Sequence, residues 1–307
     1  MRALITGAAG FIGSTLADTL LNDGIDLVAI DSFTPYYDRG TKTANTGRFA
    51  DRLVEADLLT VDLPKLLDGV DVVFHHAAQA GVRLSWSKDF DTYVRQNVLV
   101  TQRLLEAVRE LGSSPRVIYA SSSSVYGNTP KHPTTETDPT HPHSPYGVTK
   151  LAGEHLCDLY AANWGVEVVN LRYFTVYGPR QRPDMAMHRL LRAAMTGDRF
   201  PLYGDGSAVR DFTFVDDVVN ANIAAVDGPA GVTMNVAGGG SISMSELVEL
   251  AGEVVGKRVN VERLDAQPGD VQRTGGSIER ARELLGWAPK VSVSEGLAAE
   301  AAWLRGT

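Results

Sequence analysis

Cysteine is almost absent from this chain, because Cys157 is the single cysteine among its 307 residues. No intramolecular disulfide can therefore form, and a cytoplasmic location is expected. An excess of positive charge is also missing, since the net charge is −8 at pH 7. A protein that binds nucleic acid or an anionic membrane surface would carry a basic patch, so neither partner is expected.

Long hydrophobic runs are lacking as well. The longest uncharged stretch near the N-terminus covers residues 3–17, and it is too short and too rich in glycine to span a bilayer. No cleavable targeting pattern is evident there. With 44% hydrophobic and 21% charged residues, the composition is that of an ordinary globular protein with enough chain for a large core.

A ligand set for a metal is not evident either. His132, His141 and His143 fall in a proline-containing loop over residues 128–144, but without a recognisable ligand spacing. We therefore expect no metal, and we interpret the loop as a flap beside a binding site.

Glycines gather at one place near the N-terminus. Gly7, Gly10 and Gly13 follow a predicted strand over residues 2–6 and open a predicted helix over residues 11–23. Glycine lets the backbone turn tightly and approach a pyrophosphate, and a helix N-terminus offers it free N–H groups. The spacing G-x-x-G-x-x-G differs from the commoner G-x-G-x-x-G. We interpret this turn as a dinucleotide-binding segment.

Asp31 ends a second predicted strand, over residues 26–31. A carboxylate at this point can accept hydrogen bonds from an adenosine ribose, and it would repel a 2′-phosphate. The expected cofactor is therefore NAD. Arg39, Lys42 and Arg48 follow closely, and they keep NADP as an alternative.

Tyr146 and Lys150 lie four positions apart at the start of a helix predicted over residues 145–164. Residues with this spacing share one helix face, so both side chains can reach one site. An ammonium near a phenol favours the phenolate and lowers the phenol pKa. The pair is suited to taking a proton from an alcohol while hydride leaves the same carbon. An amphipathic helix face without catalytic function is the alternative.

Apolar runs alternate with amphipathic helical patterns in the first half of the chain, which predicts an α/β fold with a Rossmann-type doubly wound parallel sheet. Strands are expected at 2–6, 26–31, 53–57, 70–75, 116–120 and 166–172, and helices at 11–23, 91–111 and 145–164. Beyond residue 174, shorter strands are expected near 200–203, 209–214 and 232–236, with helices near 184–196, 215–227, 243–255, 276–286 and 293–305. We predict a dinucleotide-binding domain over residues 1–173, to which later segments can return. A smaller mixed α/β substrate lobe is expected mainly over residues 174–307.

Several segments together resemble the extended short-chain dehydrogenases, specifically the NAD-dependent nucleotide-sugar epimerases and dehydratases. They are residues 6–13, 57–58, 75–78, 121–127, 146–150, 171–179 and 210–216. The resemblance runs along nearly the whole chain. It implies an NAD-dependent enzyme that acts on a nucleotide sugar.

The resemblance also implies which residues bind NAD. Asp57 and Leu58 are expected to contact the adenine, and Lys150 to hold the nicotinamide ribose. The full expected set is Gly7, Gly10, Phe11, Ile12, Gly13, Asp31, Ser32, Asp57, Leu58, Ala77, Ala78, Gln79, Asn97, Tyr146, Lys150 and Tyr173. His76 stands where the family usually has an apolar residue, and we interpret it as a tolerated variant.

The serines that follow the strand at 116–120 can direct hydroxyl groups toward Tyr146. By the resemblance, Ser122 hydrogen-bonds the reacting sugar oxygen, whereas Ser123 and Ser124 face other parts of the sugar. Related 4,6-dehydratases carry an Asp-Glu pair in this segment, and related decarboxylases of UDP-glucuronate carry a glutamate. This chain has no carboxylate there, so the resemblance implies a 4-epimerase.

The expected reaction begins with the Tyr146 phenolate, which takes the proton of the sugar C4 hydroxyl with help from Lys150 and Ser122. C4 gives a hydride to NAD, the 4-keto sugar turns about its pyrophosphate linkage, and the hydride returns to the opposite face. NAD is regenerated in each cycle and stays bound.

The nucleotide of a UDP-sugar needs cations for its phosphates and a pocket for its base. Arg210 and Arg273 are candidates for the phosphates, and Asp270 for the ribose. Leu202 and Tyr203 are candidates for contact with the base. The alternatives are a solvated surface charge for each arginine and a buried strand residue for the tyrosine.

Three segments resemble UDP-glucuronate 4-epimerases in particular, namely residues 31–38, 78–83 and 174–186. A substrate carboxylate needs a cation and hydroxyl donors, which Arg182, Thr175 and the serines can supply. Arg83 is a further candidate contact. UDP-glucose/UDP-galactose, or an N-acetylated analogue, is the alternative substrate, and a decarboxylase or dehydratase is less favoured.

The helices expected at 91–111 and 145–164 carry apolar stripes, and their counterparts in the family pair across a two-fold axis. The resemblance therefore implies a homodimer, although such stripes would equally well pack on the sheet. A protein that binds NAD without turnover is the competing class, but such chains lack the tyrosine or the lysine of the catalytic pair. A one-way dehydrogenase that releases NADH is another alternative.

Overall fold

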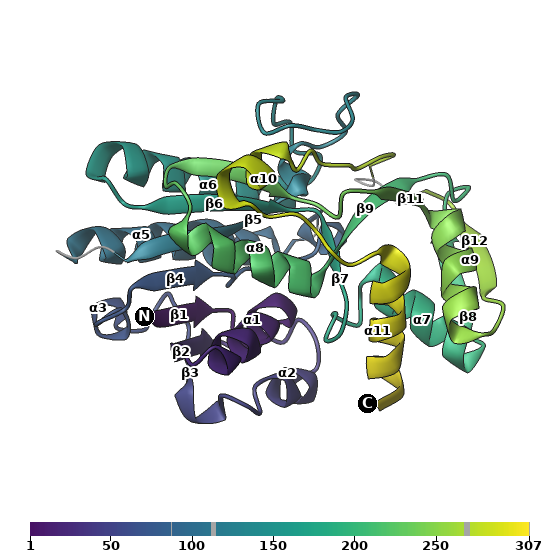
Figure 1. Cartoon of the computed structure of the whole chain (residues 1–307), viewed down its shortest axis with the longest axis horizontal. Helices are drawn as coiled ribbons and strands as arrows, with labels where there is room; N and C mark the ends of the chain where they lie inside the picture. Colours follow the sequence, from purple (N-terminus) through teal and green to yellow (C-terminus); the bar gives the residue numbers. More distant parts are fainter. Residues whose placement is uncertain (87, 112–114, 267–270, 307) are drawn as a thin grey trace.

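The computed structural model describes residues 1–86, 88–111, 115–266 and 271–306 (Figure 1). Asp270, the expected ribose contact, lies outside these residues. Within the described part, one sheet has seven parallel strands in the order β10-β6-β5-β4-β1-β2-β3. They are β1 (Arg2–Thr6), β2 (Asp26–Asp31), β3 (Leu53–Glu55), β4 (Val72–His75), β5 (Arg116–Ser122), β6 (Val168–Tyr173) and β10 (Val232–Val236). The order reverses between β1 and β4, which confirms the predicted Rossmann-type doubly wound sheet.

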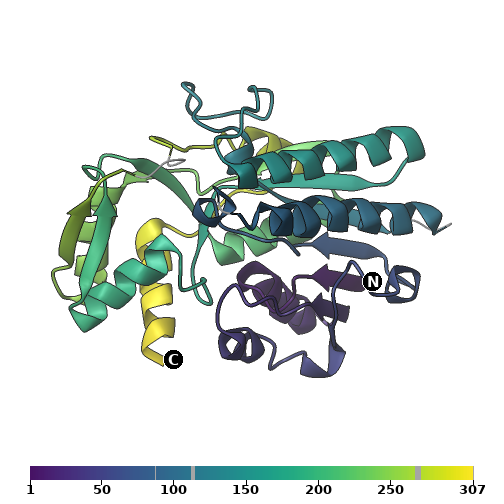
Figure 2. The ribbon, with the colours of Figure 1, turned by 180° about the vertical axis from the view of Figure 1, so that it is seen from behind.

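Both faces of this sheet are apolar, so helices cover both (Figures 1 and 2). In β1, Ala3 and Ile5 belong to one hydrophobic cluster and Leu4 to the other, as the two-residue period of a strand requires. One face is covered by α1 (Phe11–Asn22), α8 (Val215–Asp227) and α10 (Glu279–Leu285), and the other by α3 (Leu63–Leu66), α5 (Val100–Glu110) and α6 (Pro145–Trp164). Among the described residues, no helix has the length and apolar character needed to cross a membrane.

The helix expected over residues 91–111 is interrupted by a wider turn. It begins as α4 (Phe90–Tyr93), continues as a π-helical segment over Val94–Leu99, and becomes α5 at Val100. Such π segments often occur at functional sites, because they turn a side chain away from the regular helical position. Here the segment contains Asn97, whose side chain is buried beside the residues that follow β4.

A smaller lobe lies beyond the C-terminal ends of the main strands (Figure 1). Its sheets have the orders β11-β9-β7 and β12-β8. Their strands are β7 (Thr175–Tyr177), β8 (Arg199–Tyr203), β9 (Val209–Phe214), β11 (Ser241–Ser243) and β12 (Asn260–Leu264). The lobe also contains α7 (Ala186–Thr196), α9 (Met244–Val255) and α11 (Val293–Gly306), and α9 packs against both of the others. A capping box between Ser243 and Glu246 fixes the start of α9.

The structure differs from the sequence-based expectation in two further respects. The strand expected in the smaller lobe near residues 232–236 is β10, which instead pairs with β6 and extends the main sheet. The helices expected in that lobe near residues 215–227 and 276–286 are α8 and α10, which instead cover the main sheet. Several short elements are not predicted by the sequence, including α2 (Arg39–Asn45), α3, β7, β11 and β12, and single 3₁₀ turns at Ala50–Arg52, Arg83–Trp86 and Ser123–Val125. Short or exposed segments lack the hydrophobic period that would identify them. The division of the chain at residue 173 stays a prediction.

Candidate active site

A cavity lies at the C-terminal edge of the main sheet, where doubly wound sheets bind ligands. The predicted residues that line it are Gly7, Gly10, Phe11, Ile12, Gly13, Asp31, Ser32, Leu58, Ala77, Ala78, Gln79, Tyr146, Lys150, Tyr173 and Arg182. The fold thus brings the glycine turn, Asp31 and the Tyr146–Lys150 pair to one place from three parts of the chain. The wall also contains residues that were not predicted from sequence, among them Thr34, Tyr36, Tyr37, Gln96 and Ser121.

The glycine turn has close backbone contacts that only glycine permits. Gly7 has a φ of 72°, and a Cβ atom there would lie 2.8 Å from the backbone nitrogen of Ala77. A Cβ atom on Gly13 would lie 2.4 Å from the carbonyl oxygen of Gly7. Gly10 precedes the first turn of α1, and the residues of that turn line the cavity. This arrangement fits a pyrophosphate held at a helix N-terminus.

Asp31 is held in place by the backbone on two sides. Its Oδ2 atom accepts a hydrogen bond from the Ala9 N–H at 3.0 Å, and its Oδ1 atom accepts one from the Phe33 N–H at 2.7 Å. Each carboxylate oxygen has further acceptor capacity, so the group can still receive ribose hydroxyls. Asp31 is therefore both a support for the glycine turn and a candidate ribose ligand.

The basic residues near Asp31 are mostly engaged elsewhere. Arg39 forms an ion pair with Glu55 at 2.6 Å, and Arg48 donates a hydrogen bond to Asn22 at 2.8 Å. Lys42, in the unpredicted helix α2, does line the cavity, and burial lowers its pKa. The two arginine charges therefore give no support for a bound 2′-phosphate.

Asn97 and Asp57 are expected cofactor residues that do not line the cavity. Asn97 accepts a hydrogen bond from the Gln79 N–H at 2.7 Å and donates one to the Gln79 carbonyl at 3.0 Å. Asp57 accepts a hydrogen bond from the Leu59 N–H at 2.9 Å. Asn97 thus holds the backbone of Gln79, which lines the cavity, and Asp57 holds the backbone just after Leu58, which also lines it. Contact of Asn97 and Asp57 with a cofactor stays a prediction.

The expected catalytic pair lies in the first turns of α6. Ser144 caps this helix by accepting a hydrogen bond from the Gly147 N–H at 3.1 Å. Lys150 then directs its ammonium to the Ala120 carbonyl, with a distance of 2.8 Å from Nζ to oxygen. Burial lowers the pKa of Lys150 to about 8.

The surroundings of Tyr146 act on its pKa in both directions. Burial raises this pKa, while a hydrogen bond with Ser122 and the positive charge of Arg182 act in the opposite direction. The Lys150 ammonium, which the sequence suggested as a favourable charge for Tyr146, is bound to the Ala120 carbonyl. The predicted effect of Lys150 on the pKa of Tyr146 stays a prediction.

The serine segment forms a tight turn at the end of β5. Ser122 Oγ accepts a hydrogen bond from the Ser124 N–H at 3.1 Å and donates one to Ser124 Oγ at 3.1 Å. Its interaction with Tyr146 agrees with a shared role at one reacting oxygen. The preceding serine, Ser121, lines the cavity but was not predicted, and its hydroxyl donates a hydrogen bond to the buried Glu154. Contacts of Ser123 and Ser124 with a sugar stay predictions.

Arg182 reaches the same cavity from the loop that follows β7. Asp184 accepts hydrogen bonds from its Nε at 3.0 Å and from its Nη2 at 3.1 Å. The ring of Tyr36 lies against the guanidinium, with 5.3 Å between Cζ and the ring centroid. These contacts hold the cation beside Tyr146 while leaving further N–H groups for a ligand. Thr175, the other expected carboxylate contact, is a half-buried residue at the start of β7.

Two other expected substrate residues stack on each other. The Arg83 guanidinium lies over the Tyr203 ring, with 4.2 Å from Cζ to the centroid. Leu202 is the strand neighbour of Tyr203, and it is buried beside a second cavity that Val248 also lines. Because successive strand residues face opposite sides, the two side chains point in different directions, and their contact with a base stays a prediction.

Arg210 and Arg273 lie near each other at the edge of the smaller lobe. Arg210 Nη1 donates to the Val209 carbonyl at 2.9 Å, and Val209 forms a β-bridge with Arg273. Neither arginine lines the cavity that holds Tyr146. Their proximity fits a shared phosphate site, but that role stays a prediction.

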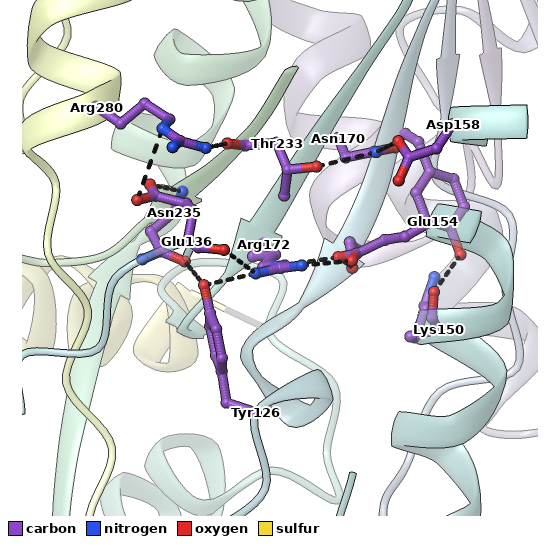
Figure 3. Close-up of polar contacts among 12 residues, drawn as sticks. Tyr126, Glu136, Lys150, Glu154, Asp158, Asn170, Arg172, Thr233, Asn235 and Arg280 are labelled. Carbon is purple, nitrogen blue, oxygen red and sulfur yellow. Dashed lines mark hydrogen bonds and ion pairs between the residues drawn. The ribbon is translucent and has the colours of Figure 1, made fainter. Parts of the chain in front are cut away.

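A buried polar network supports the active-site helix from behind (Figure 3). Arg172 of β6 donates to Glu154 of α6, with 2.9 Å from Nε to Oε1 and 2.7 Å from Nη2 to Oε2. Its Nη1 donates to Tyr126 Oη at 2.8 Å, and Tyr126 donates to Asn235 Oδ1 at 2.7 Å. The Asn235 N–H in turn donates to Glu136 at 2.8 Å. These contacts connect α6 with β6, β10 and the loop over residues 128–144, and they were not predicted from sequence.

That histidine-containing loop is anchored at its centre. The Thr134 N–H donates to the Gly275 carbonyl at 2.7 Å, and Asn235 Nδ2 donates to the Thr134 carbonyl at 3.0 Å. Whether the loop moves as a flap stays a prediction. No group of three or more His, Cys, Asp or Glu side chains in the described ranges is arranged to hold a metal ion.

Comparisons with known proteins agree with this geometry. The model of the NAD dependent epimerase/dehydratase family matches residues 3–237. A Bacillus subtilis protein named as an uncharacterized UDP-glucose epimerase is 42% identical, over 99% of this chain and 98% of that protein. The UDP-glucose 4-epimerase of Mycolicibacterium smegmatis is 40% identical, over 97% of this chain and 96% of that enzyme. Among solved structures, the chain is similar to the crystal structure of UDP-glucuronic acid 4-epimerase from Bacillus cereus in complex with UDP-glucuronic acid and NAD. The TM-score is 0.96 and the sequence identity is 42%, and the match covers 100% of this chain and 99% of that one. This chain therefore belongs to the NAD-dependent epimerase/dehydratase family.

Proposed function

We propose that this chain is a 4-epimerase that uses NAD to convert UDP-glucuronate to UDP-galacturonate. The family and the relatives, which include 4-epimerases of UDP-glucose and of UDP-glucuronic acid, support the reaction and the cofactor. One observation carries the choice of sugar. Arg182 lies in the same cavity as Tyr146 and Lys150, so a cation is available close to the reacting C4 hydroxyl.

The cavity wall fits NAD at both ends. Gly7 and Gly13 allow close approach to the pyrophosphate, and Asp31 offers acceptors to the adenosine ribose. Lys150 and Tyr173 are the proposed contacts at the nicotinamide end. When bound there, NAD supplies a reversible hydride acceptor.

The chain's own residues handle the proton. Tyr146 is the proposed general base for the C4 hydroxyl, and Ser122 is proposed to hydrogen-bond the same oxygen. Lys150 is fixed by the Ala120 carbonyl and supplies positive charge at this end of the cavity. The serine turn contributes hydroxyls but no carboxylate, so it offers neither acid nor base for dehydration across C5 and C6.

Arg182 is the proposed partner of the substrate carboxylate. Asp184 occupies its Nε and Nη2 edge, which orients the guanidinium and leaves the Nη1 group to meet a second carboxylate. A carboxylate held by a cation would also be less prone to leave as CO₂ once C4 is a ketone. Charge-assisted hydrogen bonds of this kind contribute about 1.5–3 kcal/mol, or about 10- to 150-fold in binding.

UDP-glucose is the alternative substrate, and one observation favours it. Asp184 already balances the charge of Arg182, so a neutral CH₂OH group would meet a site without net charge. The Mycolicibacterium smegmatis relative is named for this sugar.

Turnover of the two sugars by the purified protein tests the proposal. UDP-glucuronate and UDP-glucose are supplied separately, and products are resolved by NMR for wild type, Arg182→Met and Asp184→Asn. We expect UDP-galacturonate without CO₂ or net NADH, and a loss of kcat/KM of about 10- to 150-fold for UDP-glucuronate in Arg182→Met. Conversion of UDP-glucose alone would overturn the choice of sugar. Equal effects of Arg182→Met on both sugars would overturn the role of Arg182.

We also propose that the chain forms a homodimer through α6 and the π-helical segment before α5. Leu99 lies on that segment, and Val148, Leu159 and Trp164 lie on α6, each 46–55% exposed. Exposed apolar side chains on neighbouring helices are typical of an interface. In sedimentation, the Leu159→Glu variant should be a monomer. The control variant Leu284→Glu, which changes an exposed residue on α10, should remain a dimer. A monomeric wild type would contradict the proposal.

A further inference from the structure

Three side chains from separate elements form a hydrogen-bonded group at the cavity. His76 follows β4, Tyr173 ends β6, and Asn222 lies in α8. Asn222 Oδ1 lies 3.1 Å from His76 Nε2 and 2.8 Å from Tyr173 Oη. The His76 and Tyr173 rings also lie near each other, with centroids 6.1 Å apart and an angle of 52° between the ring planes. Asn222 is fully buried, and the other two residues line the cavity.

The hydrogen positions in this group follow from Asn222. Its Nδ2 donates to the Val218 carbonyl at 2.8 Å, which fixes the orientation of the amide. Its Oδ1 can then only accept, so both His76 Nε2 and Tyr173 Oη have to donate. Neutral histidine carries one N–H, and His76 is neutral because burial lowers its pKa to about 4. His76 Nδ1 is therefore an acceptor, and the Tyr173 oxygen keeps only lone pairs for other partners.

Both acceptors belong to the end of the cavity that carries the catalytic pair. The positive charge of Lys150 acts on His76, and Lys150 lines the same cavity. His76 Nδ1 is buried and has no hydrogen-bond partner among the described residues. An unpaired buried acceptor costs free energy unless a ligand donates to it. At this end of NAD, the amide donor is the carboxamide NH₂ of the nicotinamide.

We propose that His76 is a positioning residue. By donating to Asn222 Oδ1, it helps to hold the amide at the place where Tyr173 has to donate to it, which leaves the Tyr173 oxygen as a hydrogen-bond acceptor for the nicotinamide carboxamide. His76 is then not the tolerated variant that the sequence suggested. Its Nδ1 atom adds a second acceptor to the same wall. The proposal rests on NAD as the cofactor in the proposed function, and it does not depend on the identity of the sugar.

Binding of three nucleotides to nucleotide-free protein separates this role from a general structural role. The probes are NAD, ADP-ribose, which lacks the nicotinamide, and 3-acetylpyridine adenine dinucleotide, which lacks the carboxamide NH₂. For His76→Leu, we expect the Kd of NAD to rise about three- to tenfold, which corresponds to the loss of one hydrogen bond. The Kd values of ADP-ribose and of the acetylpyridine analogue should change less than twofold.

Two further variants control the experiment. His76→Gln can keep a donor near Asn222, so it should bind NAD within about twofold of wild type. Tyr173→Phe removes the acceptor. In this background, the further change His76→Leu should therefore weaken NAD binding less than His76→Leu does in the wild type. If His76→Leu does not fold, the ratio of NAD to ADP-ribose affinity in Tyr173→Phe decides the question.

The proposal is overturned if His76→Leu leaves all three Kd values unchanged, or raises those of NAD and ADP-ribose equally. An unchanged affinity ratio in Tyr173→Phe would also overturn it. These binding measurements contain no sugar. A failure to epimerise either UDP-sugar, with the NAD results as expected, would reject the proposed function and leave this inference standing.

Discussion

Replacing Glu154 with glutamine is expected to destabilise the protein strongly. The side chains of Glu154 and Arg172 are 3% and 7% exposed, and two hydrogen bonds of 2.9 and 2.7 Å join them (Figure 3). Glutamine has nearly the same shape but no charge, so it leaves the guanidinium buried without a counter-ion. Removing one partner of a buried ion pair costs about 3–5 kcal/mol. Tyr126 still accepts from Arg172, which favours the lower part of that range.

Urea unfolding at fixed protein and NAD concentrations measures this loss. With a denaturant slope of about 3 kcal/mol per M, the midpoint should fall by about 1–1.7 M. Glu167→Gln is the matched control, because Glu167 pairs with Arg116 at the surface and is 54% exposed. Such exposed pairs contribute about 0–1 kcal/mol, so the control midpoint should move by less than about 0.3 M.

A double substitution distinguishes the buried charge from simple loss of packing. Replacing both Glu154 and Arg172 with methionine removes both charges and keeps much of the volume. The double variant should be more stable than Glu154→Gln, because no unpaired charge remains. The reasoning is refuted if Glu154→Gln unfolds within 0.3 M of wild type, or if the double variant is the less stable of the two.

Tyr146→Phe should lower kcat by about 10²–10⁴-fold in the NMR turnover assay, and a loss below tenfold would contradict its role as the base. Burial raises the pKa of Glu300 from its ordinary value of 4.5 to about 8, although a hydrogen bond from the Gly178 N–H acts to lower it. Between these two pH values, the carboxyl group keeps its proton in the native state and loses it in the unfolded chain. The free energy of unfolding should therefore fall between about pH 4.5 and 8, by up to about 1.4 kcal/mol per pH unit, and urea unfolding of Glu300→Gln should lack this slope. Arg180 has a φ of 70° and pairs with Asp18, so Arg180→Gly should be more stable to urea than Arg180→Ala by about 1 kcal/mol, and equal stability would exclude strain at this position.

The parts of the site that could be predicted from sequence are those set by local spacing. The glycine turn, Asp31 at a strand end, and the Tyr146–Lys150 pair are each defined within a few residues of chain. A strand followed by a glycine turn and a helix has only one arrangement that offers N–H groups to a pyrophosphate. The same locality explains why the parallel strands and long helices of the main sheet were predicted with small errors at their ends.

The contacts that sequence reasoning missed join residues far apart in the chain. Tyr36 donates to Asp184 at 3.4 Å across 148 positions, and this contact helps to hold Arg182 at the cavity. β10 joins the main sheet although 58 residues separate it from β6 in sequence (232 − 174). A pattern of apolar residues shows that a strand exists, but it does not identify the neighbour with which the strand pairs.

Burial explains the limits of arguments from residue type at this site. A buried polar group needs a partner, and that partner decides what the group can offer to a ligand. The Ala120 carbonyl fixes the Lys150 ammonium, whereas Ser122 and Arg182 act to lower the pKa of Tyr146 against the effect of its burial. Asn222 takes the only hydrogen of Tyr173, so that phenol can act only as an acceptor toward the cavity. Residue types at the cavity therefore define the chemistry that is available, whereas partners supplied by distant elements determine which donor or acceptor is presented.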